Sequence, residues 1–168
     1  MERCDIYDAE RRPLGKTRPR GAVLPRGEYH LTAFVWVFNS AGQVLLTRRA
    51  PEKKSYPNQW AMTGGAVQAG EDTRQAICRE LREETGLRAQ PEAFWRAETF
   101  RFEDTICDVF FLRMDAPIGA LTLQPEETSE ARWVDRAELE RMIAKRLIAR
   151  PDALHYAQFG DKLDGWIK

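Results

Sequence analysis

A glycine-bearing loop that leads straight into an acid-rich helix is the feature that most restricts this chain. The stretch spans residues 65–87, and residues 79–84 read Arg-Glu-Leu-Arg-Glu-Glu. On a helix, Glu80, Glu83 and Glu84 stand at i, i+3 and i+4, so they share one face. Like charges at these spacings repel, so a positive group is expected on that face. Clustered carboxylate oxygens suit a hard divalent cation such as Mg²⁺.

Residues 65–87 resemble the Nudix box, whose pattern is G-x5-E-x7-R-E-U-x-E-E-x-G-U with U aliphatic. Every constrained position matches: Gly65, Glu71, Arg79, Glu80, Leu81, Glu83, Glu84, Gly86 and Leu87. A solvated acidic helix is the common alternative. It does not account for the glycines and Glu71 at the required offsets, and the loop–helix context of the motif is also met.

The resemblance to the Nudix family implies a metal site and a base. Glu80, Glu83 and Glu84 would hold Mg²⁺, for which Mn²⁺ can substitute, and the Gly65 carbonyl would be a further ligand. A glutamate of the box, with Glu83 and Glu80 as candidates, or a later acid would be the general base. Bound metal ions would neutralise the diphosphate oxygens and lower the pKa of a water molecule.

Arg79 is expected to act on the site without touching the substrate. Residue 79 points about 100° away from residue 80 on a helix, so the two cannot face the same metal. A guanidinium can hold two carboxylate oxygens at once. We therefore expect Arg79 to orient Glu71 or a ligand carboxylate.

Charged residues outside the box provide further candidates. An additional acid is expected before the strand at 131–134, where the choices are Glu126, Glu127 and Glu130, and we choose Glu127. A solvated acidic loop is the alternative. Basic residues that could contact phosphate oxygens are Arg48, Arg49, Lys53 and Lys54, of which Arg48 and Arg49 are the predicted substrate-binding pair. Surface charges that serve solubility remain an open alternative for them.

Length and composition narrow the class of protein. The 168 residues suit one domain over 1–168. Lys plus Arg and Asp plus Glu total 26 each, so no basic excess favours a nucleic-acid polymer as partner. The three scattered cysteines form no Cys-x-x-Cys pair, and a reducing cytoplasm is the simplest compartment. Neither a signal peptide nor a bilayer-length apolar run is seen, so no membrane partner is expected.

Periodicity and turn residues predict a mixed sheet between helices. Strands are predicted at 4–8, 31–38, 43–48, 60–64, 97–102, 106–114, 121–123 and 131–134, and helices from 72, from 135 to about 148, and from 151. The strand at 31–38 is apolar on both faces and should be central, forming a hairpin with 43–48. The expected fold class is α/β, a sheet sandwiched between α-helices, which the resemblance makes a Nudix fold.

The segment 11–26 contains only basic charges. Its cations are Arg11, Arg12, Lys16, Arg18, Arg20 and Arg26. Such a run favours a solvated hairpin edge, where Lys and Arg discourage strand pairing. A phosphate-seeking arm is the alternative.

Residues 30–60 are similar to isopentenyl diphosphate isomerase, which also has a Nudix-type fold, and His30 matches one of its metal-binding histidines. In the isomerase, a reactive cysteine and a histidine stand shortly after the tryptophan that ends this segment, in a Cys-Gly-His run. Here that run reads Gly64-Gly65-Ala66. The allylic rearrangement then has no proton donor, whereas the box, degenerate in such isomerases, is complete.

The expected function is therefore that of a Mg²⁺-dependent pyrophosphohydrolase. Its partner would be a small-molecule diphosphate, either a nucleoside diphosphate derivative or a related organic diphosphate. An isomerase-like enzyme and a non-catalytic Nudix module that senses a ligand are the alternatives. The oligomeric state is open, with a homodimer as one option.

Overall fold

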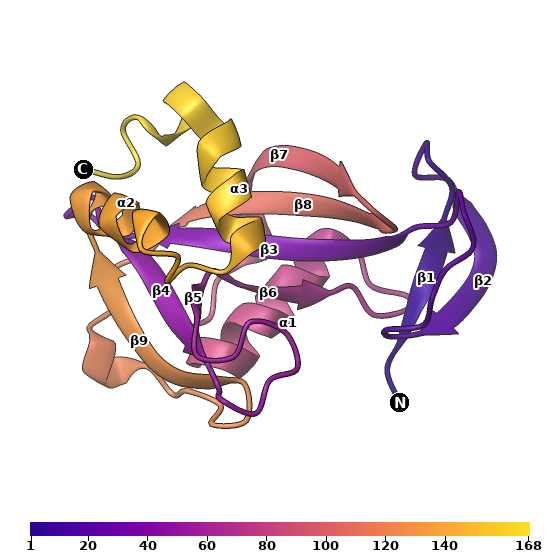
Figure 1. The fold of residues 1–168 in the computed structure, drawn as a ribbon, viewed down its shortest axis with the longest axis horizontal. Coiled ribbons are helices and arrows are strands. Elements are labelled where there is room, and N and C mark those ends of the chain that lie inside the picture. The colour runs from indigo at the N-terminus through magenta and orange to yellow at the C-terminus, as the bar shows by residue number, and fades with distance from the viewer.

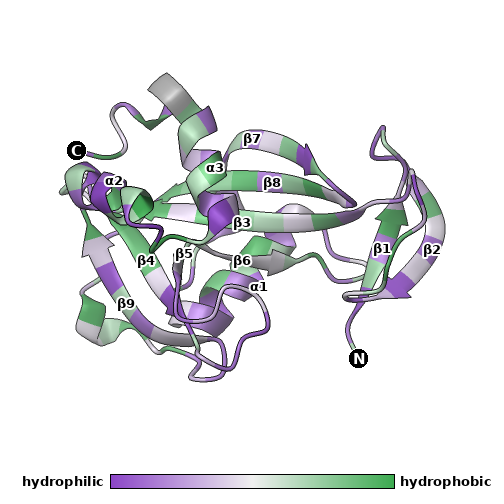
Figure 2. Ribbon diagram, in the orientation of Figure 1, coloured by the Kyte–Doolittle hydropathy of each residue, from purple (hydrophilic) through white to green (hydrophobic). Residues whose placement is uncertain are grey.

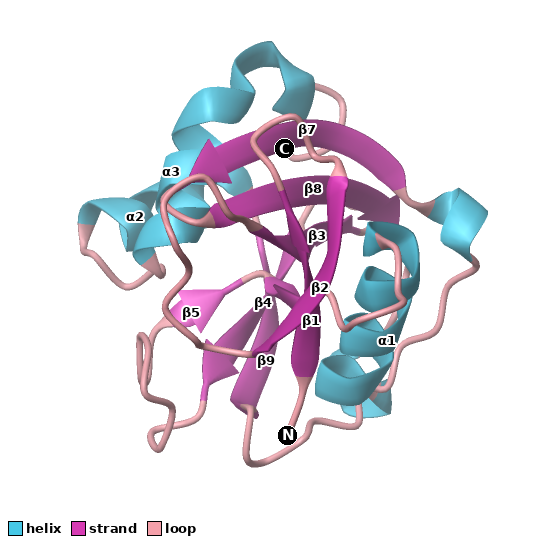
Figure 3. Ribbon diagram, turned by 90° about the vertical axis from the view of Figure 1, so that its right-hand side faces the viewer, coloured by secondary structure: helices cyan, strands magenta, loops and turns pink.

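A seven-stranded mixed sheet between helices forms the body of the molecule (Figures 1 and 3). The computed structural model describes residues 1–168, apart from the side chains of residues 160 and 161. The strands of this sheet are β3 (His30–Phe38), β4 (Val44–Arg49), β5 (Trp60–Ala61), β6 (Thr63–Ala66), β7 (Trp95–Phe102), β8 (Thr105–Arg113) and β9 (Thr128–Val134). One face carries α1 (Thr73–Thr85), and the other carries α2 (Arg136–Ala144) and α3 (Arg150–Phe159). The predicted α/β class with a sheet between helices is confirmed.

Strand β3 is central, as its two apolar faces predict. It runs parallel to β8 from His30↔Thr105 to Phe38↔Arg113. Its other edge pairs antiparallel with β6. Alternate residues of β3 therefore enter two cores, one beneath α1 and one beneath α3. Figure 2 shows the hydrophobic colour along β8, the neighbour of β3.

The hairpin predicted between residues 31–38 and 43–48 is wrong beyond its turn. Strands β3 and β4 share only the pair Phe38↔Val44. The β3 edge is occupied by β6 from Thr32 to Val35, so β4 diverges and pairs with β5 and β9 instead. The predicted strand at 60–64 is correspondingly divided into β5 and β6.

Two other predicted elements differ from the structure. Residues 121–123 form no strand: they follow the short 3₁₀ turn η2 (Ile118–Ala120), and Thr122 donates its N–H to the last carbonyl of α1 at 2.9 Å. The helix predicted to reach 148 ends at Ala144, because the backbone of residues 147–149 pairs with Trp60. Further 3₁₀ turns are η1 (Pro91–Ala93) and η3 (Gly160–Leu163). Among the described residues, no helix is long and apolar enough to cross a bilayer.

The basic N-terminal segment forms a hairpin edge, as predicted. Strands β1 (Arg3–Tyr7) and β2 (Pro13–Pro19) make a separate two-stranded sheet. Figure 1 shows it at the end of the main sheet, where the loop before α1 turns. A bridge between Tyr7 and Tyr29 joins the hairpin to the segment that enters β3.

A buried carboxylate on β8 fastens this hairpin to the body. Asp108 is fully buried and accepts two hydrogen bonds from Arg11, at 2.8 and 2.6 Å. Thr73 at the start of α1 and Thr99 on β7 each donate a hydroxyl to it at 2.7 Å. Burial works to raise the pKa of Asp108, but the bonds from Arg11 and the threonines outweigh it and hold the pKa below its usual value.

Replacing Asp108 with Asn should destabilise the fold by about 3 kcal/mol, because Arg11 loses its buried counter-charge. The expected measurement is a lower urea midpoint at neutral pH. Since the folded-state pKa is depressed, the stabilisation by Asp108 is present above the unfolded value and lost as the pH falls below it. Asp164→Asn, which removes an exposed partner of Arg136, is the matched control and should change stability by less than about 0.5 kcal/mol. Equal midpoints for the two variants would contradict this role.

Candidate active site in the loop–helix segment

The helix that carries the acids begins where the sequence predicts. The Asp72 side chain accepts from the Gln75 N–H at 2.8 Å, and the Gln75 side chain accepts from the Asp72 N–H at 2.9 Å, which forms a capping box. Gly86 ends α1 in the left-handed conformation with φ of 75°. Ile77 and Leu81 are fully buried against the sheet. These contacts fix which side of α1 faces the site.

Two glycines of β6 let the backbone approach its neighbours closely. A Cβ atom on Gly65 would lie 2.4 Å from Oε1 of Glu80, and one on Gly64 would lie 2.4 Å from the Ala33 carbonyl oxygen. Any side chain at either position would therefore force the structure to shift. The Gly65 backbone thus lies directly against the Glu80 carboxylate.

Arg79 lies at the centre of the acidic residues. Its Nε and Nη2 donate to the two oxygens of Glu71 at 2.9 and 3.0 Å. Its Nη1 donates to Glu80 at 2.8 Å and to Glu83 at 3.3 Å, and Nη2 also reaches the Ala66 carbonyl oxygen at 3.1 Å. The predicted contact with Glu71 is present. The long side chain also returns to Glu80, which the helical angle alone does not anticipate, and hydrogen bonding to Glu71 leads the interactions that raise the pKa of Arg79.

The three helix glutamates differ in environment. Glu80 and Glu84 are buried, whereas the Glu83 side chain is 41% exposed. Burial raises the pKa of Glu84 to about 8, and the charges of Glu80 and Glu127 act in the same direction. Burial also raises the pKa of Glu80, partly offset by Arg79. Glu84 is therefore a buried carboxyl whose raised pKa the nearby Arg49 and Thr63 offset only in part.

The residues present fit a hard divalent cation. In the described part of the chain, no three acidic, histidine or cysteine side chains converge closely enough to hold a metal ion together, and Glu80 and Glu83 are turned to Arg79. Yet the donors are all oxygens, the ligand type that Mg²⁺ prefers. The close approach of Gly65 and Glu80 provides a cradle that any side chain would fill.

Further charged groups surround this centre. Glu127 is paired with Lys53, and its negative charge acts on Glu84. Arg49 on β4 also lies close enough for its charge to act on Glu84, while its Nε donates to the Ser55 carbonyl at 2.8 Å. The structure therefore brings Glu127, Lys53 and Arg49 to the acidic centre.

Other predicted residues are engaged elsewhere or exposed. Arg48 lies 3.6 Å from Glu130 and donates to the Asn58 carbonyl oxygen at 3.1 Å. Glu126 is exposed. The sequence does not distinguish these residues from Arg49 and Glu127, because all of them lie on short charged segments.

Comparison with known proteins identifies the domain to which this loop–helix segment belongs. The model of the NUDIX domain matches residues 28–156. The chain belongs to the Nudix family. It is 36% identical to an uncharacterized Nudix hydrolase of Listeria monocytogenes, over 84% of this chain and 85% of the relative. The crystal structure of DR0079 from Deinococcus radiodurans superposes with a TM-score of 0.73 at 26% identity, covering 97% of this chain and 96% of that one. The fold is the Nudix fold, as predicted.

The similarity to the isomerases is also present. An isopentenyl-diphosphate Delta-isomerase of Shigella dysenteriae is 30% identical over 84% of this chain and 81% of the relative. The positions of the isomerase's Cys-Gly-His run are Gly64, Gly65 and Ala66, where the backbone lies against Ala33 and Glu80. His30 contacts the Thr105 hydroxyl at 3.1 Å, at the outer end of β3.

Sequence reasoning missed a buried acid on α3. Asp152 is 3% exposed, and one of its side-chain oxygens has no partner among the described residues. Burial raises its pKa to about 7, and Arg49 acts to lower it. Arg49 thus lies near both Asp152 and Glu84. Because these residues are far apart in the chain, no local pattern indicates the arrangement.

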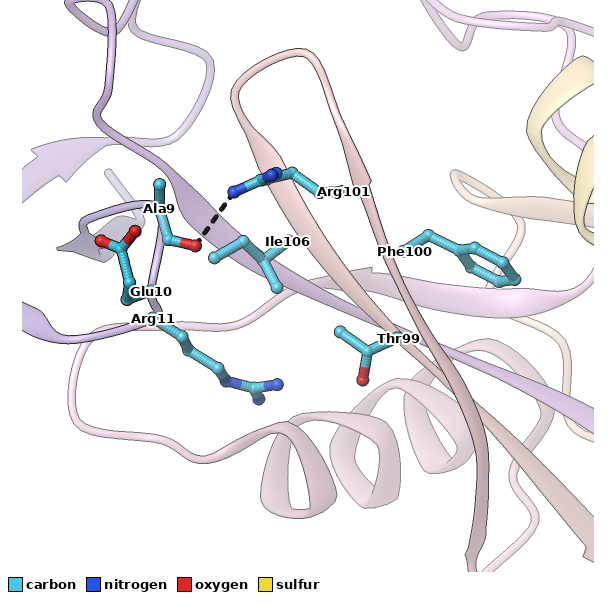
Figure 4. Close-up of a pocket in the computed structure, with 7 residues that line it drawn as sticks. All are labelled: Ala9, Glu10, Arg11, Thr99, Phe100, Arg101 and Ile106. Atoms are coloured by element: carbon cyan, nitrogen blue, oxygen red, sulfur yellow. Dashed lines mark hydrogen bonds between the residues drawn. The ribbon is translucent and has the colours of Figure 1, made fainter.

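A pocket on the far side of the hairpin is separate from the Nudix box (Figure 4). It measures about 300 Å³ and is lined by residues of the β1–β2 turn and of β7 and β8. Its cations already have partners: Arg11 binds Asp108, and Arg101 donates to the Ala9 carbonyl oxygen at 3.1 Å. Arg11 is therefore neutralised by a buried carboxylate.

Glu84→Gln should stabilise the metal-free protein at pH 8 by an amount on the order of 2 kcal/mol, since one pKa unit corresponds to about 1.4 kcal/mol. The folded state binds this proton more tightly than the unfolded state, so wild-type stability should fall as the pH rises from 4.5 to about 8. Urea unfolding in chelator across this range measures both effects. Exposed Glu126→Gln is the control for loss of one charge, and a Glu84 variant no more stable than that control would refute the interpretation.

Proposed function

We propose that this chain is a Mg²⁺-dependent pyrophosphohydrolase that cleaves the diphosphate linkage of a nucleoside diphosphate derivative or a related organic diphosphate. Membership of the Nudix family places it among enzymes that act on phosphoanhydride bonds. The observation that carries the proposal is the folded box itself. A buried carboxyl at Glu84 has no hydrogen-bonded cation among its described neighbours, and it stands beside a glycine cradle at the Glu80 carboxylate.

Glu80, Glu83 and Glu84 would hold the cation, together with the Gly65 carbonyl. The bound ion would neutralise phosphate oxygens and lower the pKa of a water molecule. A buried carboxyl such as Glu84 is costly as an anion in the free protein. Its burial therefore supports a positive charge as its partner in the working enzyme.

In the proposed reaction, the oxygen of a water molecule forms a bond to one phosphorus of the diphosphate. The bridging P–O bond breaks, and its electron pair stays on the phosphate that leaves. The proton from the water passes to a carboxylate, for which Glu83 is proposed because it is the exposed glutamate of the box. Glu127 is the alternative acceptor, since it is held at the same centre by Lys53.

The substrate's negative charge would meet Arg49 and Lys53. The charge of Arg49 acts on Glu84, and Lys53 is paired with Glu127, which supports both as candidates. Arg48 was predicted with Arg49, but it is paired with Glu130 and is the weaker candidate. Guanidinium groups match phosphate oxygens with paired hydrogen bonds, which favours Arg49 for contact with the diphosphate.

Two alternatives remain for the experiment to separate. An isomerase needs an acid beside the C=C bond, and Gly64 and Ala66 supply none. A module that only senses a ligand would not need a buried carboxyl with a raised pKa, which destabilises the fold. Both features favour hydrolysis.

The decisive test is turnover of a panel of diphosphates, followed by anion-exchange chromatography with Mg²⁺, Mn²⁺ or chelator. The panel contains nucleoside di- and triphosphates, sugar nucleotides, dinucleoside polyphosphates and isopentenyl diphosphate. Metal-dependent hydrolysis is expected, with no dimethylallyl diphosphate formed. Glu84→Gln should lower turnover at least about a hundredfold, which corresponds to about 2.7 kcal/mol. Activity that survives chelation would contradict the metal role, and the absence of any turnover would favour a sensing module.

Arg79→Lys should lower kcat more than it raises KM. Lysine keeps the charge but cannot bind Glu71 with two parallel hydrogen bonds while also reaching Glu80. The box carboxylates would then lose their orientation without loss of a substrate contact. Arg141→Lys, which removes the contacts of an exposed arginine with Glu138 on α2, is the control and should leave both constants unchanged. A raised KM with unchanged kcat for Arg79→Lys would instead mean that Arg79 binds the substrate.

A further inference from the structure

The N-terminal hairpin brings a cation to the edge of the Nudix box. Arg20 directly follows β2, and its Nη1 donates to Oε2 of Glu2 at 2.7 Å. The other oxygen of Glu2 accepts from the Gln68 side chain at 3.2 Å. The Gln68 N–H in turn donates to Glu71 at 3.1 Å. A continuous chain of contacts therefore leads from Arg20 to the carboxylate that Arg79 holds.

Backbone contacts fix this end of the hairpin in place. The Ala69 N–H donates to the Arg3 carbonyl oxygen at 2.8 Å, and the Gly70 N–H donates to the Asp5 side chain at 2.8 Å. Both donors belong to the loop between Gly65 and Glu71. Because loop and hairpin are tied at successive residues, the end of the hairpin that carries Arg20 has a defined position beside the box.

Arg20 lies near enough to the acids of the site for their charges to act on it, but it donates a hydrogen bond to none of them. Burial works to lower its pKa, but the hydrogen bond to Glu2 and the charges of Glu2, Glu80 and Glu127 outweigh burial and raise it. Within the described residues, Glu2 alone accepts a hydrogen bond from its guanidinium. The side chain is 49% exposed. An arginine has five N–H donors, so this half-exposed side chain keeps donors that Glu2 does not use.

We propose that Arg20 is a substrate-binding residue that donates hydrogen bonds to non-bridging oxygens of the diphosphate, and that Glu2 positions its guanidinium. The inference rests on the proposed hydrolysis at the box. A polyanion that approaches a group of glutamates is repelled unless cations stand beside them. Arginine suits this task because its planar fork matches phosphate oxygens. The predicted hairpin edge thus also serves, through this one residue, as the phosphate-seeking arm.

A purely structural role for Arg20 would be neutralisation of the neighbouring acids. Such a role would affect stability rather than the affinity for a phosphate. Arg12 provides a matched comparison, because it lies on the same hairpin and pairs with Asp8 and Glu10 within the turn. Arg12→Ala and Arg20→Ala therefore change the charge of the hairpin equally.

The test is calorimetric binding of methylenediphosphonate, a non-hydrolysable diphosphate, to the full chain with Mg²⁺, alongside steady-state kinetics on the best substrate of the panel. Arg20→Ala should weaken binding about tenfold and raise KM to a similar extent with kcat little changed. Arg20→Lys should recover part of the loss. Glu2→Gln should weaken binding about threefold, and Arg12→Ala should match wild type.

The outcomes separate the two proposals. If wild type hydrolyses a diphosphate while Arg20→Ala binds the probe as tightly as Arg12→Ala, the role of Arg20 is overturned and the proposed function stands. If wild type neither binds the probe nor hydrolyses any member of the panel, both are overturned. Thermal unfolding of each variant shows whether it is folded. Should Arg20→Ala fail to fold, Arg20→Lys and Glu2→Gln decide the matter, and wild-type affinity in both would overturn the proposal.

Discussion

One guanidinium holds the acidic side of this molecule together. Arg79 binds Glu71, Glu80, Glu83 and a loop carbonyl at the same time. Without it, three carboxylates would crowd a partly buried space, where unpaired charges are costly. The contact also joins the end of the glycine loop to α1. The hairpin docked on this loop is held in addition by Asp108 and by the bridge between Tyr7 and Tyr29.

Glu84 is the part of this arrangement that Arg79 does not neutralise. Its carboxyl is buried, and burial raises its pKa to about 8. Natural sequences avoid such local conflicts except at sites where function requires them. A fold selected for stability alone would place an apolar side chain at this position. The conflict at Glu84 therefore indicates function more strongly than the acidity of the helix does.

Local patterns predicted the elements whose signals are local. The start of α1 near residue 72 and the spacing of the box depend on residues a few positions apart. Elements whose backbone partners lie far away were predicted less well. Strand β4 leaves β3 because β6 occupies that edge, and α2 ends early because residues 147–149 pair with Trp60. The local sequences of residues 43–48 and 135–148 contain no signal that indicates these distant partners.

The candidate site also consists of a part that local sequence indicates and a part that only distant segments complete. The box supplies the acids from one continuous segment, so its spacing alone indicated the chemistry. The charges around these acids come from the hairpin, β4, the loop before β9 and α3. Only the fold brings these distant segments near the acids of the box, and the residues concerned are Arg20, Arg49, Glu127 and Asp152. The isomerase positions add a steric limit, because at Gly64 a side chain would meet the backbone of Ala33 and at Gly65 it would displace the Glu80 carboxylate. Groups that select a substrate must therefore reach this centre from these outer elements, and differences among relatives of this fold are expected there.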